Sequence, residues 1–311
     1  MKTVWTGLGT AVALAVLFAA PAFAQTKEVT IGYQDMVVPY RMAQEAKEIE
    51  KQTGYKVNWK QFGGGGEVIK AMASGAVQIG EVGSAGVAAA VSRGEPYELF
   101  WILDDIGDAE ALVAKNGSGI NSVADLKGKK IGLNKGSNVH YLLVRALDKA
   151  GLKYADVELV FLPPADGRAG FEKGVIDAWV IWEPYRTAAE MSLGARTLTD
   201  GTGLVSNNDF FFVAKPFALA RRELIDVVFG ATRDVFAQAA KDIPGTAKTF
   251  SAAAGFPVTV LEATLSHRGF DVRPISSEVI DEQQRIADTF KEIGLIPVTI
   301  KVSDAVHKSG S

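Results

Sequence analysis

The chain of 311 residues contains no cysteine and only three histidines, His140, His267 and His307. The missing thiols exclude disulfides, a thiolate metal site and a cysteine nucleophile. The sequence also lacks the G-x-S-x-G and H-E-x-x-H patterns of hydrolases and zinc proteases, and no predicted strand is followed by G-x-G-x-x-G. We therefore expect no enzymatic activity, no metal site and no cofactor.

An excess of one charge is also missing, because 33 lysine and arginine residues face 36 aspartate and glutamate residues. A chain without a basic excess gives no reason to expect binding to nucleic acid or to an anionic membrane. Beyond the N-terminal segment, no apolar run reaches the ~18 residues that a membrane-spanning helix needs. The chain is long enough to bury a large core, which at this length is usually divided between two lobes.

Residues 1–24 have the pattern of a secretory signal peptide. Lys2 gives a positive start, an apolar run extends from Val12 to Ala20, and residues 22–24 (Ala-Phe-Ala) have the small-x-small pattern of a cleavage site. A single anchoring helix is the alternative, but the run is short for a membrane span. We expect export to the periplasm and, because no cysteine lies near the cut, no lipid anchor.

Strand and helix patterns alternate along the rest of the chain. Period-2 alternation predicts strands, and apolar residues at helical spacing predict helices. The predicted strands cover 28–33, 56–62, 77–81, 96–103, 110–114, 130–133, 157–161, 178–181 and 209–213. The predicted helices cover 39–53, 67–74, 84–92 and 139–150, and then about 217–240, 244–254, 257–266 and 276–293. This order predicts an α/β fold of two parallel-sheet lobes with a helical C-terminal region and a ligand cleft between the lobes.

Three predicted helices begin at turns rich in glycine and serine. The turns are 63–66 (Gly-Gly-Gly-Gly), 83–86 (Gly-Ser-Ala-Gly) and 136–141 (Gly-Ser-Asn-Val-His-Tyr). Such turns let a ligand approach backbone N–H groups, and a helix N-terminus favours an anion. Each turn alone is equally explained by tight packing or by helix capping. Together they indicate an anion site made of amides and hydroxyls.

Two carboxylates are candidates for the opposite charge. Glu110 and Asp209 each begin a predicted strand, and Trp182 ends another. A pair of acids beside an aromatic wall is a common solution for an ammonium group. The alternative is that both acids are solvated and that Trp182 belongs to the core.

Several segments resemble the periplasmic taurine-binding proteins of ABC importers. They include 33–34, 71–80 (Ala-Met-Ala-Ser-Gly-Ala-Val-Gln-Ile-Gly), 82–84, 110–113, 128–131, 140–141, 162–164, 176–178 and Trp182. The resemblance extends over roughly 28–300 and includes the wider group of sulfonate, nitrate and thiamine-precursor binding proteins. It implies a periplasmic binding protein fold of type II, with lobe 1 formed by 25–104 and 214–311 and lobe 2 by 105–213.

The same resemblance implies roles for individual residues. The residues expected at the sulfonate end are Gly65, Ser84, Ser137, Asn138 and His140, and those expected around the rest of the ligand are Gln34, Glu110, Trp182 and Asp209. The chain departs from the family pattern at Ala85-Gly86, where the relatives often have Ser-Pro, and at Glu183. This last residue either contacts a larger cationic ligand or caps the helix that begins near Pro184.

We expect a monomeric solute-binding protein that captures taurine between two closing lobes and delivers it to the membrane permease of an ABC transporter. The alternatives are a binding protein for another small sulfonate or an amine-bearing anion, and an enzyme of the thiamine-precursor type. The absence of cysteine argues against the enzyme. An alkanesulfonate without a cation gives no reason to bury two acids.

Overall fold

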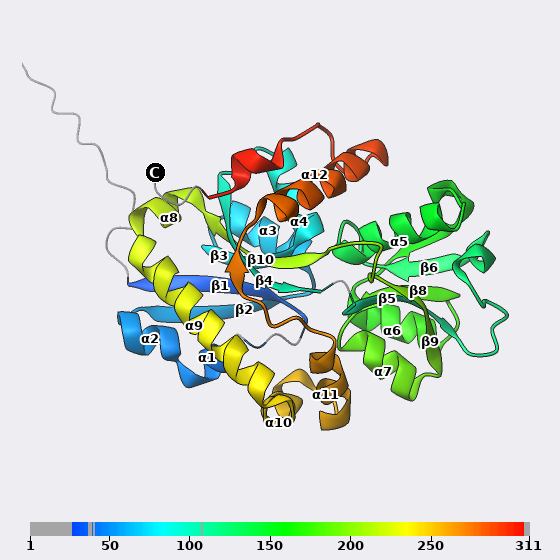
Figure 1. Cartoon of the computed structure of the whole chain (residues 1–311), viewed down its shortest axis with the longest axis horizontal. Helices are drawn as coiled ribbons and strands as arrows, with labels where there is room; N and C mark the ends of the chain where they lie inside the picture. Colours follow the sequence, from blue (N-terminus) through cyan, green and yellow to red (C-terminus); the bar gives the residue numbers. More distant parts are fainter. Residues whose placement is uncertain (1–26, 37–38, 40, 107, 308–311) are drawn as a thin grey trace, which may run out of the picture.

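The computed structural model describes residues 27–36, 39, 41–106 and 108–307. The predicted signal peptide lies outside them. Within the described residues the strands form a six-stranded sheet, ordered β11-β4-β10-β3-β1-β2, and a five-stranded sheet, ordered β7-β6-β8-β5-β9. Figure 1 shows the two sheets side by side, each with helices packed on it. The predicted α/β class with two sheets is confirmed.

The first sheet gathers strands from both ends of the chain. Its strands are β1 (Glu28–Gln34), β2 (Lys56–Phe62), β3 (Ile79–Gly83), β4 (Tyr97–Asp105), β10 (Asn208–Ala214) and β11 (Arg273–Pro274). The helices between its early strands are α1 (Arg41–Ala46), α2 (Glu48–Thr53), α3 (Gly65–Ala73) and α4 (Ser84–Ser92). One helix was predicted over 39–53, but Lys47 adopts a left-handed conformation with φ of 51° and divides it in two.

The second sheet comes from one continuous stretch of chain. Its strands are β5 (Glu110–Lys115), β6 (Lys130–Leu133), β7 (Glu158–Phe161), β8 (Ala178–Trp182) and β9 (Ala195–Asp200), and its helices are α5 (Asn138–Lys149), α6 (Pro164–Glu172) and α7 (Tyr185–Ser192). Short 3₁₀ helices lie at Val123–Leu126 and Tyr154–Asp156. The sequence patterns missed α6 and β9.

The sheets are mixed, although parallel sheets were predicted. In the first sheet β1 is parallel to β2 and β3, whereas β10 runs antiparallel to β3 and β4. In the second sheet β5 runs antiparallel to β8 and β9. Both reversed strands follow the two places, 106–109 and 201–207, where the chain passes from one sheet to the other.

The lobe boundary predicted at residue 213 falls within β10. β10 was assigned to the second lobe, but it lies in the middle of the first sheet, between β3 and β4. Three consecutive side chains of this strand, Phe210, Phe211 and Phe212, are fully buried. A strand that is covered on both faces reads as a continuous apolar run instead of an alternating one.

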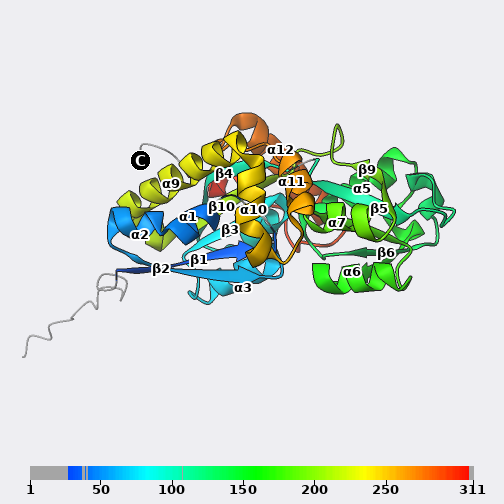
Figure 2. The same ribbon diagram turned by 90° about the horizontal axis from the view of Figure 1, so that it is seen from below.

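The C-terminal region is helical, as predicted. It contains α8 (Lys215–Ala220), α9 (Arg222–Lys241), α10 (Ile243–Ala254), α11 (Val258–Ser266), α12 (Ser277–Glu292) and a 3₁₀ helix at Val302–Ala305. α12 packs on α4, and α11 contacts α7 of the second sheet (Figure 2). Asp242 caps α10 by accepting the Gly245 N–H at 2.9 Å. Helices of this region therefore contact both groups of strands.

Candidate functional site

Three helices begin at one cavity between the two sheets. α3 begins at Gly65, α4 at Ser84 and α5 at Asn138, and residues from all three turns line the cavity. The N-cap residues of α3 and α4 are glycines, and Ser137 at the N-cap of α5 makes no side-chain cap hydrogen bond. Uncapped N–H groups and the positive end of the helix dipole favour an anion at such a position.

We call this space the inner cavity. Its volume is about 30 Å³, and it is lined by Gln34, Met36, Gly65, Gly66, Gly83, Gly86, Ile106, Glu110, Asn134, Gly136, Ser137, Asn138, Trp182 and Asp209. A space of this size holds water but no larger molecule. Seven of the nine predicted site residues are among these lining residues, and Ser84 and His140 are not.

Glu110 and Asp209 place two acids in the wall of the inner cavity. Each residue is 1% exposed. Asn207 donates from Nδ2 to Glu110 Oε2 at 2.5 Å. Burial raises the pKa of Glu110 well above its usual range, and burial together with the nearby Glu81 raises the pKa of Asp209 to about 8. Carboxyl groups that have lost their water favour a cation beside them.

Three further charged residues lie behind Asp209, and the sequence analysis missed all of them. Arg268 donates from Nε to Asp104 Oδ2 at 2.6 Å and from Nη2 to Asp209 Oδ2 at 3.2 Å. Glu81 accepts from the Gln34 backbone N–H at 2.8 Å and from Gln34 Nε2 at 2.7 Å. Glu81, Asp104 and Arg268 are buried. Glu81, Asp104, Glu110, Asp209 and Arg268 form what we call the buried acid cluster.

Contacts from Trp182 and Tyr185 join the two sheets beside the inner cavity. Trp182 Nε1 donates to the Asp35 carbonyl oxygen at 3.3 Å, and the Tyr185 hydroxyl donates to Asp35 Oδ2 at 2.8 Å. On the opposite side, the Ala85 N–H of α4 donates to Asn138 Oδ1 of α5 at 2.9 Å. These contacts hold the walls of the inner cavity together.

Ser84 has a structural role in this conformation. Its hydroxyl oxygen accepts from the Asn208 N–H at 3.0 Å and from Gln283 Nε2 at 2.7 Å, and it lies 3.3 Å from the Asn208 carbonyl oxygen. The residue is fully buried and ties the start of α4 to β10 and α12. The hydroxyl that was predicted to meet the sulfonate thus has other partners here, because three elements converge on it.

His140 is also directed away from the inner cavity. Its Nδ1 accepts from the Gly136 N–H at 3.1 Å, and its Nε2 lies 2.6 Å from the Tyr154 hydroxyl. Burial, with a smaller effect of Lys135, lowers the pKa of His140 to about 4, so the ring is neutral at neutral pH. Both ring nitrogens have partners in this conformation, where the contact with Gly136 fixes the turn before α5, and the sulfonate contact of His140 stays a prediction.

Glu183 caps a helix, which is the second of the two roles considered for it above. It accepts from the Thr187 N–H at 3.1 Å and from Thr187 Oγ1 at 2.8 Å, in the first turn of α7. Its two oxygens also lie 3.2 Å from Thr264 Oγ1 and 2.7 Å from His267 Nδ1. The carboxylate does not line the inner cavity. It caps α7 and connects this helix to α11.

This arrangement predicts a pH-dependent contribution of His267 to stability. The hydrogen bond to Glu183 raises the pKa of His267 above its usual range. The stabilisation is present in full below pH ~6.5, the unfolded value, and is lost as the pH rises through the folded pKa. His267→Asn should therefore lower the free energy of unfolding more at pH 6 than at pH 9 in denaturant titrations. Ser266→Ala is the control, and an equal deficit at both pH values would contradict the ion pair.

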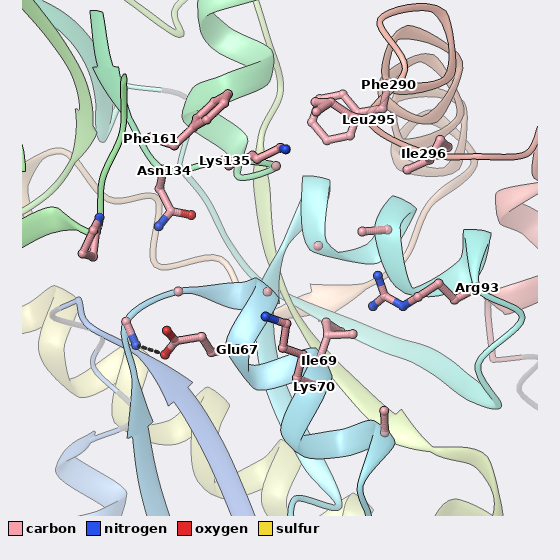
Figure 3. Close-up of a pocket in the computed structure, with 18 of the residues that line it drawn as sticks. Glu67, Ile69, Lys70, Arg93, Asn134, Lys135, Phe161, Phe290, Leu295 and Ile296 are labelled. Carbon is pink, nitrogen blue, oxygen red and sulfur yellow. Dashed lines mark hydrogen bonds between the residues drawn. The ribbon is translucent and has the colours of Figure 1, made fainter. Parts of the chain in front are cut away.

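A larger space adjoins the inner cavity. This outer cavity has a volume of about 820 Å³, and it shares Gly66, Gly86, Asn134 and Gly136 with the inner one. Figure 3 shows Phe161, Phe290, Leu295 and Ile296 on one side of this space, and Lys70 and Arg93 on the other. Arg93 is paired with Glu95 at 3.0 Å. The outer cavity thus combines an apolar wall with basic side chains.

The described residues contain no group of three or more His, Asp or Glu side chains that could hold a metal ion. In the same part of the chain, no helix is long and apolar enough to cross a membrane.

Comparison with known proteins assigns the chain to a family. The model of the NMT1/THI5-like family matches residues 46–242. The chain belongs to this family. Its structure is similar to that of the periplasmic aliphatic sulphonate binding protein SsuA from Escherichia coli, with a TM-score of 0.84 and 32% identity over 91% of this chain and 92% of that one.

Two other relatives extend the comparison. The alkanesulfonate-binding protein SsuA from Xanthomonas axonopodis pv. citri, bound to MOPS, has a TM-score of 0.86 and 32% identity over 92% of this NMT1/THI5-like chain and all of that one. The taurine-binding periplasmic protein of Escherichia coli (strain K12) is 36% identical over 217 residues, which are 67% of each chain. By name, all three relatives are binding proteins and none is an enzyme.

Proposed function

We propose that this protein is the periplasmic solute-binding component of an ABC importer and that it captures a small sulfonate, with taurine as the first candidate. The observation that carries the proposal is the inner cavity itself. Three helix N-termini meet two buried acids, Glu110 and Asp209, within one small space. Taurine is a zwitterion with a sulfonate at one end and an ammonium group at the other, so it suits both parts of the wall.

Binding requires the walls to separate. A cavity of about 30 Å³ cannot admit a ligand the size of taurine. The contacts from Trp182 and Tyr185 to Asp35, and from Ala85 to Asn138, cross between the two groups of strands. We expect these contacts to break on opening and to form again around the ligand, so that the ligand shifts an equilibrium between open and closed forms.

A longer sulfonate is the second candidate. The outer cavity continues from the inner one and has an apolar wall. A sulfonate held on the helix N-termini could therefore extend an alkyl tail past Gly66 and Gly86 toward Phe161 and Phe290. The higher coverage of the sulfonate-binding relatives, compared with the taurine-binding one, also supports this candidate.

Calorimetric titration of the protein from Gln25 onward with taurine, ethanesulfonate, hexanesulfonate and propylamine separates the two candidates. The zwitterion site predicts that taurine binds at least about 10-fold more tightly than ethanesulfonate or propylamine, since each of these lacks one charged end. Hexanesulfonate binding more tightly than taurine would favour the longer sulfonate. Equal binding of taurine and ethanesulfonate would exclude a role for the two acids in ligand recognition.

A further inference from the structure

The buried acid cluster contains more acids than its one guanidinium can neutralise. Arg268 interacts with Asp104, Asp209 and Glu81, Glu110 lies near Asp209, and all five residues are at most 6% exposed. Unpaired carboxylates in such a place are costly, so some of these groups hold protons at neutral pH. The open question is what happens to those protons when a cation enters the inner cavity.

We propose that the ammonium group of the ligand displaces a proton that Glu81 and Asp209 share, and that Glu81 is a positioning residue that makes capture specific for a cationic ligand. This inference rests on the proposed binding of an aminosulfonate. The inference adds two points to that function. A proton leaves the protein each time a ligand is bound, and ligand specificity depends on Glu81, which does not itself line the inner cavity.

The geometry places one acid in the wall and the other directly behind it. Asp209 lines the inner cavity, and Glu81 is fully buried. The two strands pair Asp209 with Gly83 and Phe211 with Glu81, so both acids lie on the same face of the sheet, two positions apart in register, and the charge of Glu81 acts on Asp209. Two buried carboxyl groups that interact in this way hold one proton between them, because ionising both in so little water is costly.

The remaining contacts fix this pair. Both Glu81 oxygens accept hydrogen bonds from Gln34, at 2.8 and 2.7 Å, and Arg268 donates to Asp209 at 3.2 Å. These hydrogen bonds keep both side chains in place. The pair can therefore respond to an ammonium group by losing its proton, and not by moving a carboxyl group out of the way. Asp104 also accepts a hydrogen bond from Arg268. The guanidinium group is therefore partly neutralised by Asp104 and stabilises a negative charge on Glu81 and Asp209 less strongly.

The other charged groups that act on this region are Asp104, Asp105, Glu110 and Arg268. Burial raises the pKa of Glu81 and Glu110, and burial with the charge of Glu81 raises the pKa of Asp209 to about 8. At pH 7 the shared proton is thus present in the free protein. An ammonium group that enters beside Asp209 supplies positive charge in its place, one O–H bond breaks, and the proton passes to solvent.

Proton release makes the affinity for taurine depend on pH. Because the free protein holds the proton and the complex does not, binding strengthens as the pH rises. The logarithm of the association constant should increase by at least about one per pH unit from pH 6 to pH 7. A ligand without an ammonium group should show no such slope, since it gives the proton no reason to leave.

Titration calorimetry at pH 7 in phosphate and in Tris tests this directly, because the two buffers take up a proton with different heats. With the unmodified protein, the buffer dependence of the binding enthalpy should report at least one proton released per taurine, with Glu110 able to add a second, and none per ethanesulfonate. If taurine binds with the same enthalpy in both buffers, the proton inference is overturned and the proposed function stands. If taurine does not bind at all, the proposed function itself fails.

Two matched variants assign the effect to Glu81. In Glu81→Gln the side-chain amide can donate to an ionised Asp209 without a shared proton, so about one proton fewer should be released per taurine than in the unmodified protein. The control is Glu98→Gln on β4. This change removes the carboxylate that forms an ion pair with Lys215, and Glu98 does not line the inner cavity, so proton release should stay unchanged. Equal release by both variants would remove Glu81 from the mechanism. The two-buffer result on the unmodified protein decides the main point even if Glu81→Gln does not fold.

Discussion

Glu110→Gln is expected to weaken taurine binding by about 30-fold or more, and to leave ethanesulfonate binding within about threefold. Glu110 is buried in the wall of the inner cavity, and Asn207 is its hydrogen-bond donor. Removing one partner of a buried, hydrogen-bonded charge pair typically costs about 2–5 kcal/mol. Glutamine has nearly the same shape as glutamate and can still accept a hydrogen bond from Asn207. The substitution therefore removes only the negative charge that faces the ammonium group.

Calorimetry with both ligands checks this prediction. Ethanesulfonate has no cation, so a neutral amide should suit it at least as well as a carboxyl group whose pKa is raised by burial. Glu158→Gln, on the exposed edge strand β7, is the control and should change neither affinity. An equal loss for both ligands would mean that Glu110 maintains the shape of the inner cavity and does not recognise the ammonium group.

Gly83→Ala is expected to weaken the binding of both taurine and ethanesulfonate by about 10- to 100-fold. Gly83 precedes α4, and a Cβ at this position would lie 2.5 Å from Asn138 Nδ2, so the Asn138 side chain would have to move. The same Asn138 amide accepts the Ala85 N–H, so its displacement would separate the starts of α4 and α5. One or two charge-assisted hydrogen bonds, each worth about 1.5–3 kcal/mol, would then be lost at the sulfonate.

The two ligands distinguish this change from the loss of an acid. Because Gly83→Ala acts at the anion end, taurine and ethanesulfonate should lose affinity by similar factors. Gly230→Ala in α9, where a Cβ meets nothing within 4 Å, is the control and should leave affinity intact. Normal binding of both sulfonates by Gly83→Ala would contradict a site in which the starts of α4 and α5 must stay close together.

Local patterns were sufficient to predict most elements of the fold, and together with the resemblance to the binding-protein family they indicated most of the residues that line the inner cavity. The glycine turns identify the helix starts because a close approach between backbones leaves little choice of residue there. Glu110 and Asp209 stand out because each is an acid at the start of a strongly apolar strand. In both cases the chemical reason lies within a few residues of the position itself.

Partners that are distant in the sequence could not be predicted in the same way. Arg268 meets Asp104 across 164 positions and Asp209 across 59, and nothing in its own segment indicates either contact. Ser84 likewise finds Gln283 across 199 positions, which occupies the hydroxyl that was expected at the sulfonate. The antiparallel direction of β10 was missed for a related reason, since strand patterns carry no information on which neighbour a strand will pair with.

The crystal structure of the taurine complex is the most direct test of the zwitterion site. The account predicts the taurine nitrogen within hydrogen-bond distance, about 3 Å, of carboxylate oxygens of Glu110 and Asp209, and the sulfonate oxygens at the N–H groups that begin α3, α4 and α5. A complex in which the sulfonate lies on Lys70 and Arg93 in the outer cavity, or in which the nitrogen faces away from both acids, would contradict it.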